Sequence, residues 1–260
     1  MDPTNQPWAH QTTDVLRVAS SAGVLLLRSG ADVARVEDTV ARIARAYGVG
    51  EPEIYATPTG VFISLADRQT TLIKRVRSRA LALDRVSAVN ELSRGLVAHP
   101  VDPCEALRRI REIEDQPTPL PGWLDVPASG LAAAACTLLV GGTLPAVVPA
   151  FFANLVVQGG ERVCRWIGLP DAVTDLISGA NAVACAVLLN RWLGVPVGPV
   201  VAGGIMILVP GIAFTNALRD AMSGDLVSAT ARGLEAFLKV AALAAGVGSA
   251  LFLFDGGQLP

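Results

Sequence analysis

One uncharged segment, residues 192–218, constrains the fold of this chain more than any other feature. An apolar run of this length can cross a bilayer, because about 20 residues span a hydrocarbon core of about 30 Å. The run nevertheless contains Pro210 and Gly211, and Pro210 removes a backbone donor from the middle of the expected helix. Lipid cannot satisfy the backbone groups freed in this way, so such a break is tolerated where it lines a protein-enclosed or water-filled cavity. The sequence therefore predicts a broken helix of the kind with which transporters build sites.

Charged residues are unevenly divided along the chain. Residues 1–125 contain 15 Lys and Arg and 16 Asp and Glu, whereas residues 126–260 contain only 6 and 7. This division predicts a soluble first part and a membrane-embedded second part. The net charge of −2 argues against a nucleic-acid partner, which usually requires a strong basic excess.

The pattern of residues 1–115 predicts the order ααβββαα, a soluble α+β N-terminal domain with a small, mostly antiparallel sheet. Apolar stripes with helical spacing precede three short β-rich runs at 53–57, 61–66 and 70–77. Two further helices follow, the last with Pro103 in its first turn. The sequence contains no phosphate-binding loop, nucleophile motif or metal-ligand spacing. We therefore expect neither an enzyme nor a bound metal or cofactor.

A proline-rich linker at residues 116–125 is expected to join this domain to a transmembrane domain at 126–260. The long uncharged stretches there predict an all-α membrane domain of about five transmembrane helices. The expected helices span residues 127–141, 145–166, 171–193, 197–221 and 226–254. Small residues dominate these stretches, which favours assembly into a homo- or hetero-oligomer. Arginines in the loops predict a cytoplasmic N-terminal domain in a multi-pass protein.

Several polar side chains fall inside the predicted membrane helices and are candidates for substrate binding or coupling. Four of them are Asn154, Asp175, Ser178 and Asn181. Ser178 and Asn181 share one helical face, one turn from Asp175. Two interpretations stay open here: Asp175 is either a transport residue or a cap near the membrane boundary. Similarly, Asn154 either serves transport or forms hydrogen bonds between helices.

The residues that follow the break give the sharpest hypothesis. Pro210 and Gly211 free backbone carbonyls and helix ends that are able to contact a zwitterion, and Asn216 adds a side-chain amide. Asp220 is a candidate for coupling proton movement to transport. In the alternative interpretation, Asp220 and Asp225 belong to a helix end and a cytoplasmic turn, in which Asp225 caps the next helix.

Several segments resemble the threonine/serine exporter (ThrE-like) family. The first part of the chain contributes LLRSGADVARVEDTVARIARAYGV, TPTGVFISL and TLIKRVRSRALALDRVSAVNELSRGLV. The second part contributes ILVPGIAFTNALRDAMSGDLVSATARG, and the similarity covers residues 14–254 with the motifs in the family's order. By position, the resemblance implies the motif residues Gly30, Ala31, Arg35 and Glu37 in the soluble domain and Pro210, Gly211, Asn216, Asp220, Gly224, Asp225 and Arg232 in the membrane domain.

The resemblance implies a subunit of a bacterial inner-membrane exporter that moves small hydrophilic metabolites by alternating access. Full-length members join this half to a second hydrophobic domain, so the chain resembles the split two-component type with a separate small membrane subunit. The split pair is linked to succinate export, which leaves threonine/serine and a dicarboxylate such as succinate as alternative substrates. A membrane-anchored metabolite-sensing or regulatory protein is the alternative from another class. A mere anchor, however, does not need a broken polar helix.

Overall fold

The computed structural model describes residues 12–50, 52–65, 70–77, 80–117 and 122–254. The elements in chain order are α1 (Thr12–Arg28), α2 (Val33–Ala46), β1 (Glu53–Thr57), β2 (Gly60–Leu65), β3 (Thr70–Arg75), α3 (Leu83–Ala98), α4 (Pro103–Asp115), α5 (Gly122–Leu139), α6 (Leu144–Ile167), α7 (Asp171–Leu193), α8 (Val197–Ile205), the 3-10 helix η3 (Met206–Leu208), α9 (Gly211–Met222) and α10 (Leu226–Phe254). The chain divides into two compact units. Unit 1 comprises Met1–Pro117 and Ile212–Gly233, and unit 2 comprises Thr118–Gly211 and Leu234–Pro260.

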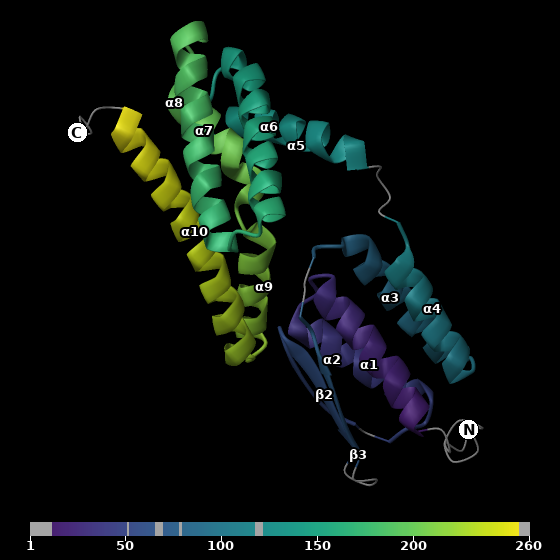
Figure 1. The fold of residues 1–260 in the computed structure, drawn as a ribbon. Coiled ribbons are helices and arrows are strands. Elements are labelled where there is room, and N and C mark those ends of the chain that lie inside the picture. The colour runs from purple at the N-terminus through teal and green to yellow at the C-terminus, as the bar shows by residue number, and fades with distance from the viewer. Residues whose placement is uncertain (1–11, 51, 66–69, 78–79, 118–121, 255–260) are drawn as a thin grey trace. The chain divides into compact units, whose positions relative to one another are not determined.

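Helix α1 is the centre of unit 1, because it packs against α2, α3 and α4 and also against β2 and β3 (Figure 1). Its apolar residues cover most of its circumference, and Val15, Leu16 and Leu26 are fully buried. Helix α2 instead has a single apolar face, on which Val36 and Val40 are fully buried. The opposite face of α2 is polar and does not pack into the apolar core, so its side chains are available to bind a ligand.

The strands form one antiparallel sheet in the order β1-β2-β3. Along the central strand, Val61, Ile63 and Leu65 alternate toward the core, as the two-residue period of a strand requires. On the other face the paired residues Tyr55 and Phe62 are exposed, with ring centroids 6.0 Å apart. The sheet therefore has one buried and one exposed face.

Unit 2 consists of α5 to α8, η3 and the part of α10 that begins at Leu234. Helix α6 lies at its centre and packs against α5, α7 and α8. Small side chains dominate the core, including those of Ala146, Ala150, Ala153, Ala182 and Ala186. Large apolar side chains such as Leu139, Trp166 and Trp192 are exposed. Small residues at helix contacts are typical of helices that pack in lipid.

The predicted fold class is wrong. It combined a soluble α+β N-terminal domain with an all-α membrane domain of about five transmembrane helices. Among the described residues, only the 2 helices α7 and α10 are long and apolar enough to cross a membrane. The number rises to 3 if α8 and α9, which are bent by 59° at their break, count as one span. The units also do not follow chain order, since residues 212–233 pack with the N-terminal elements.

Local interruptions of the apolar stretches explain this difference. The apolar helix Leu124–Leu139 in α5 is shorter than the ~20 residues that a membrane crossing needs. Helix α6 is long, but its last turns carry Glu161, Arg162 and Arg165, which are costly in lipid. The predicted domain limits stay a prediction, because residues 118–121 of the expected linker lie outside the described residues.

Helices α7 and α10 approach each other closely at two glycines. A Cβ atom added to Gly246 would lie 1.9 Å from the carbonyl oxygen of Leu176, and one added to Gly179 would lie 2.4 Å from that of Leu243. A Cβ atom on Gly248, also in α10, would meet no neighbouring atom within 4 Å. The absence of a side chain at the first two positions therefore sets the distance between the helices.

The variant Gly246→Ala tests this contact. We expect it to lower the free energy of unfolding by about 1–3 kcal/mol, the usual cost of overpacking, because the atom in the way belongs to the backbone of Leu176. The matched control Gly248→Ala should be neutral or stabilising, since alanine has the higher helix propensity. Thermal unfolding in detergent compares the two variants, and equal midpoints would contradict the close contact.

Candidate functional site: a clasp on the α1–α2 turn

The chain reverses direction between α1 and α2 at residues 29–32, referred to here as the α1–α2 turn. Gly30 has a φ of +88°, a left-handed conformation that favours glycine. The N–H groups of Gly30 and Ala31 bond back to carbonyls of α1, as is common at helix C-termini. Asp32 caps α2, because its Oδ1 accepts a 3.0 Å hydrogen bond from the backbone N–H of Arg35.

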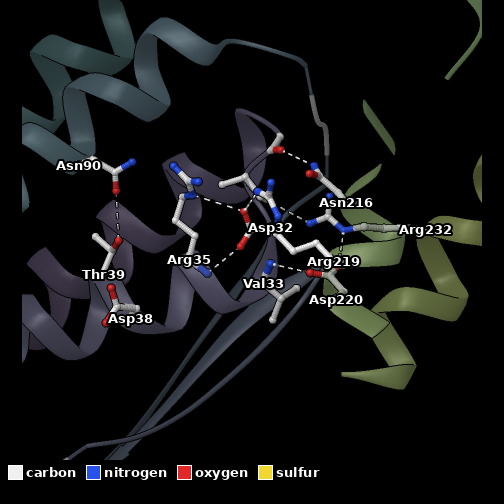
Figure 2. Close-up of polar contacts among 12 residues, drawn as sticks. Asp32, Val33, Arg35, Asp38, Thr39, Asn90, Asn216, Arg219, Asp220 and Arg232 are labelled. Carbon is white, nitrogen blue, oxygen red and sulfur yellow. Dashed lines mark hydrogen bonds and ion pairs between the residues drawn. The ribbon is translucent and has the colours of Figure 1, made fainter. Parts of the chain in front are cut away.

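The carbonyls of this turn take their donors from distant parts of the sequence (Figure 2). The Nδ2 of Asn216, in α9, donates to the carbonyl of Gly30 at 2.9 Å. A terminal guanidinium nitrogen of Arg232, in α10, donates to the carbonyl of Ala31 at 2.8 Å. Both donor side chains are buried, so the two bonds are shielded from water.

Asp220 supplies the third contact and a negative charge. Its Oδ1 accepts a 3.1 Å hydrogen bond from the N–H of Val33, the first residue of α2. Its Oδ2 lies 3.1 Å from Nε of Arg232, and the two side chains are 0% and 5% exposed. Asn216, Asp220 and Arg232 are referred to here as the clasp. Removal of either charge leaves the other buried without compensation, which costs about 3–5 kcal/mol.

A more exposed ion pair joins the same segments. One guanidinium nitrogen of Arg219 lies 3.0 Å from Oδ2 of Asp32, and Nε of Arg35 lies 3.3 Å from the same atom (Figure 2). Burial on its own raises the pKa of Asp32. The backbone hydrogen bond from Arg35 and the two guanidinium groups outweigh burial and hold this pKa below its ordinary value. Asp32 is therefore ionised at neutral pH.

Glu37, another motif residue, connects α2 to the sheet. Its Oε1 accepts a 2.8 Å hydrogen bond from the N–H of Ala56 in β1. Burial raises the pKa of Glu37, the bond from Ala56 opposes this, and the negative charges of Asp225 and Asp220 raise the pKa further. Asp220 of α9 and Asp225, directly before α10, thus act electrostatically on α2.

The segment between α9 and α10 has the geometry of a helix end followed by a cap. Gly224 has a φ of +86°, and Asp225 directly precedes α10. The Oδ1 of Asp225 accepts a 3.1 Å hydrogen bond from the N–H of Ser228, as an N-cap residue does. This geometry corresponds to the cap interpretation of Asp225.

The structure brings some of the sequence candidates together and places others elsewhere. Asn216 and Asp220 lie in the clasp, against the turn that contains Gly30. Pro210 and Gly211 are not part of the clasp and lie at the break between η3 and α9.

Asn154 lies in unit 2 and connects three helices. It is fully buried, accepts a 3.0 Å hydrogen bond from the hydroxyl of Ser129 in α5 and donates a 3.1 Å bond to the carbonyl of Gly204 in α8. These contacts have the form of hydrogen bonds between helices, which was one of the two open interpretations.

The other three candidates also lie in unit 2, on α7. Asp175 forms an ion pair with Lys239 of α10 at 3.5 Å. The buried hydroxyl of Ser178 has no hydrogen-bond partner in the described part of the chain. Nδ2 of Asn181 would lie 2.5 Å from a Cβ added to Gly160, so this side chain packs against α6. No group of three or more His, Cys, Asp and Glu side chains suited to a metal ion occurs within the described ranges.

Sequence reasoning missed the contribution of Asp32 and Arg219. Neither residue is among the candidates that the sequence predicts. Their ion pair joins residues 187 positions apart, and no local spacing predicts a contact at such a separation. The one available signal was that both residues stand beside motif residues.

A double-mutant cycle tests the charge pair of the clasp. Asp220→Asn should lower the free energy of unfolding by about 3–5 kcal/mol, because Arg232 stays buried without its counter-charge. Arg232→Gln should have a similar effect for the converse reason. The double variant should lose less than the sum of the two single losses, since neither charge is left alone. Thermal unfolding in detergent measures all four proteins, and strict additivity would argue against a direct pair.

The pH dependence of stability tests the charge of Asp32. Asparagine is also a good N-cap, so Asp32→Asn keeps the cap and removes the charge. Because the folded-state pKa of Asp32 is lowered, its charge stabilises the fold above the unfolded-state pKa of about 4. This contribution is lost as the pH falls through the folded-state pKa.

We therefore expect the variant to be less stable than the wild type at neutral pH. The difference should shrink progressively below about pH 4. Unfolding midpoints over a pH series measure this difference, and parallel profiles for the two proteins would show that the charge of Asp32 does not stabilise the fold.

Named relatives match most of the chain. The chain is 26% identical over 240 residues to the "Probable threonine/serine exporter" of Mycobacterium tuberculosis, an alignment that covers 91% of this chain and 45% of that protein. It is 24% identical over 261 residues to the "Threonine/serine exporter" of Corynebacterium glutamicum, with 94% and 52% covered. The chain thus spans about half the length of these two relatives.

A third relative is similar in length. The chain is 25% identical over 248 residues to the "Probable succinate transporter subunit YjjP" of Escherichia coli K12, with 94% of this chain and 96% of that protein covered. No solved structure gives a significant match. The model of the ThrE family, described as "Putative threonine/serine exporter", matches residues 17–254. The predicted resemblance is confirmed: the chain belongs to the ThrE family of threonine/serine exporters.

Proposed function

We propose that this chain is a subunit of an exporter in a bacterial inner membrane, which moves small hydrophilic metabolites by alternating access. The candidate substrates are threonine and serine, or a dicarboxylate such as succinate. These compounds stand in the names of the matched relatives. The broken helix at Pro210 and Gly211 is the observation that carries the proposal.

The local geometry of the break supports this proposal. Helix η3 ends at Leu208, Val209 is extended, and α9 begins at Gly211. The N–H of Gly211 bonds to the carbonyl of Val209 at 2.8 Å, which is not the pattern of a continuous α-helix. In transporters, breaks of this kind present carbonyls to cationic groups and helix N-termini to carboxylates. A zwitterion or a dicarboxylate therefore has suitable partners at such a position.

The clasp supplies a mechanical connection to this break. Asn216 and Asp220 lie on α9, the half-helix after the break. Asn216 donates to the carbonyl of Gly30 in the α1–α2 turn, and Asp220 accepts from the N–H of Val33 at the start of α2. We place α9 and the N-terminal helices in one element that moves together during transport. Protonation of Asp220 would weaken its hold on Arg232 and so release the clasp. Asp175, with Ser178 and Asn181 on the following turns of α7, is the second candidate for coupling.

The proposal includes a second membrane subunit. The Escherichia coli relative, which is matched over nearly its full length, is named a subunit. This name supports a homo- or hetero-oligomeric assembly in which another polypeptide completes the transport path. The high charge content of the first 125 residues, 15 basic and 16 acidic side chains, supports placing the N-terminal helices in the cytoplasm.

Efflux from whole cells tests the proposal against its alternative. Cells are loaded with labelled threonine, serine or succinate and compared with and without the chain and its partner subunit. We expect faster efflux of at least one of the three compounds. A membrane-anchored metabolite sensor predicts no difference for any of them, and that result would contradict the exporter.

The role of the break is tested by making the helix continuous. The variant Pro210→Ala/Gly211→Ala restores a backbone donor and raises helix propensity, and no atom lies within 4 Å of a Cβ added to Gly211. Export should fall by about tenfold or more, equivalent to ~1.4 kcal/mol, while the amount of protein in the membrane stays constant. The control Gly198→Ala, in an open position of α8, should export normally. Full export by the double variant would remove the break from the mechanism.

A further inference from the structure

An arginine-rich pocket lies on the polar face of α2, within unit 1. It has a volume of about 470 Å³ and is open to solvent. The charged side chains that line it are Asp32, Arg35, Asp38, Arg42, Arg94 and Arg219. Figure 2 shows part of this face, with Arg35, Asp38 and Thr39 on α2 opposite Asn90 on α3. Neither Pro210 nor Gly211, the residues of the proposed transport site, lines this pocket.

Helical spacing creates this polar face. Arg35, Asp38, Thr39 and Arg42 stand at positions i, i+3, i+4 and i+7 of α2, so they form one stripe along the helix. Thr39 is 1% exposed, and its hydroxyl lies 3.4 Å from Oδ1 of Asn90. This contact joins α2 to α3 at the pocket, which Thr39 and Asn90 both line.

The charges in the pocket do not balance. Four arginines face two aspartates, which leaves a surplus of two positive charges (4 − 2 = +2). Asp32 is already paired with Arg35 and Arg219, and Asp38 forms a close ion pair with Arg42.

Arg94 differs from the other three arginines of the pocket in having no carboxylate partner among the described residues. It has neither a hydrogen bond nor an ion pair to any described residue, and its side chain is exposed. Each guanidinium carries five N–H donors, so the pocket offers many more donors than its own carboxylates can accept. A ligand with several anionic oxygens would supply the missing acceptors.

We propose that this pocket binds a small organic or inorganic dianion through carboxylate or phosphate oxygens. Arginine is the side chain best suited to such oxygens, because its planar fork binds two of them at once. A ligand with a charge of −2 would neutralise the surplus of the pocket. A zwitterionic amino acid is a poorer fit, since its ammonium group meets the same positive charges.

Binding in the pocket is linked to the clasp through Arg219. This side chain pairs with Asp32 and stands next to Asp220 in α9. Because Arg219 and Asp32 both line the pocket, an anion bound there competes with Asp32 for the guanidinium of Arg219. The pocket is thus an effector site that acts on the segment carrying the clasp, and it binds its ligand whether or not the chain exports it.

Isothermal titration calorimetry on the full chain in detergent tests the site. Succinate, inorganic phosphate and threonine are titrated separately. We expect saturable binding of succinate or phosphate, whichever is the better source of the anionic oxygens, and much weaker binding of threonine. Arg94→Gln should weaken binding of the dianion by about tenfold or more, because charge-assisted hydrogen bonds to the dianion are lost. The control Arg111→Gln removes an exposed arginine of α4 outside the pocket and should bind as the wild type does.

The outcomes separate this site from the export function. Three results would each overturn the proposal: Arg94→Gln binds the dianion as the wild type does, neither dianion shows saturable binding, or threonine binds as well as the dianions. Because Arg94 has no partner among the described residues, its replacement should leave the unfolding midpoint without ligand unchanged, which shows that the variant is folded. A loss of export in cells has no bearing on the titration, so the two proposals fail separately.

Discussion

The arrangement of unit 1 depends on one buried ion pair, between Asp220 and Arg232. Two charges taken out of water are costly, and their mutual attraction repays that cost only when further hydrogen bonds satisfy both groups. The structure meets this condition in part, because Oδ2 of Asp220 is buried without a hydrogen-bond partner among the described residues. Asp220 also accepts the N–H of Val33, and Arg232 also donates to the carbonyl of Ala31. The pair therefore also satisfies two backbone groups, the carbonyl of Ala31 in the α1–α2 turn and the N–H of Val33 at the start of α2.

The buried ion pair also bears on the broken helix, the most prominent feature of the sequence. The break at Pro210 and Gly211 stands directly before α9, and α9 carries two of the three clasp residues. One side of the broken helix is thus fastened to the N-terminal helices. Asp32 and Arg219 add a weaker, more exposed pair to the same junction and connect it to the arginine-rich pocket. The clasp and the pocket thus share the α9–α2 contact within unit 1.

The sequence predicts features that depend on neighbouring residues better than contacts between residues that are far apart in the chain. The left-handed Gly30, the Asp32 cap and the apolar face of α2 follow from rules that act within a few residues. The predicted number of about five membrane-spanning helices was wrong, because hydropathy summed over long stretches passed over the short apolar part of α5 and the charges of α6. The clasp joins residues 186 to 201 positions apart, so the family resemblance identified its members without indicating that they meet. Tertiary packing alone supplies that information.

Hydrogen–deuterium exchange at the α1–α2 turn tests the central claim most directly. The N–H of Val33 precedes the hydrogen-bonded turns of α2, so without Asp220 it would exchange freely with water. The account predicts slow exchange of the peptide that contains this amide in the full chain. In the variant Asn216→Ala/Asp220→Ala, which removes the side-chain acceptor of the Val33 N–H, exchange of that peptide should be fast while peptides from the sheet stay protected. Equal exchange of the turn in the two proteins would show that the clasp does not hold it.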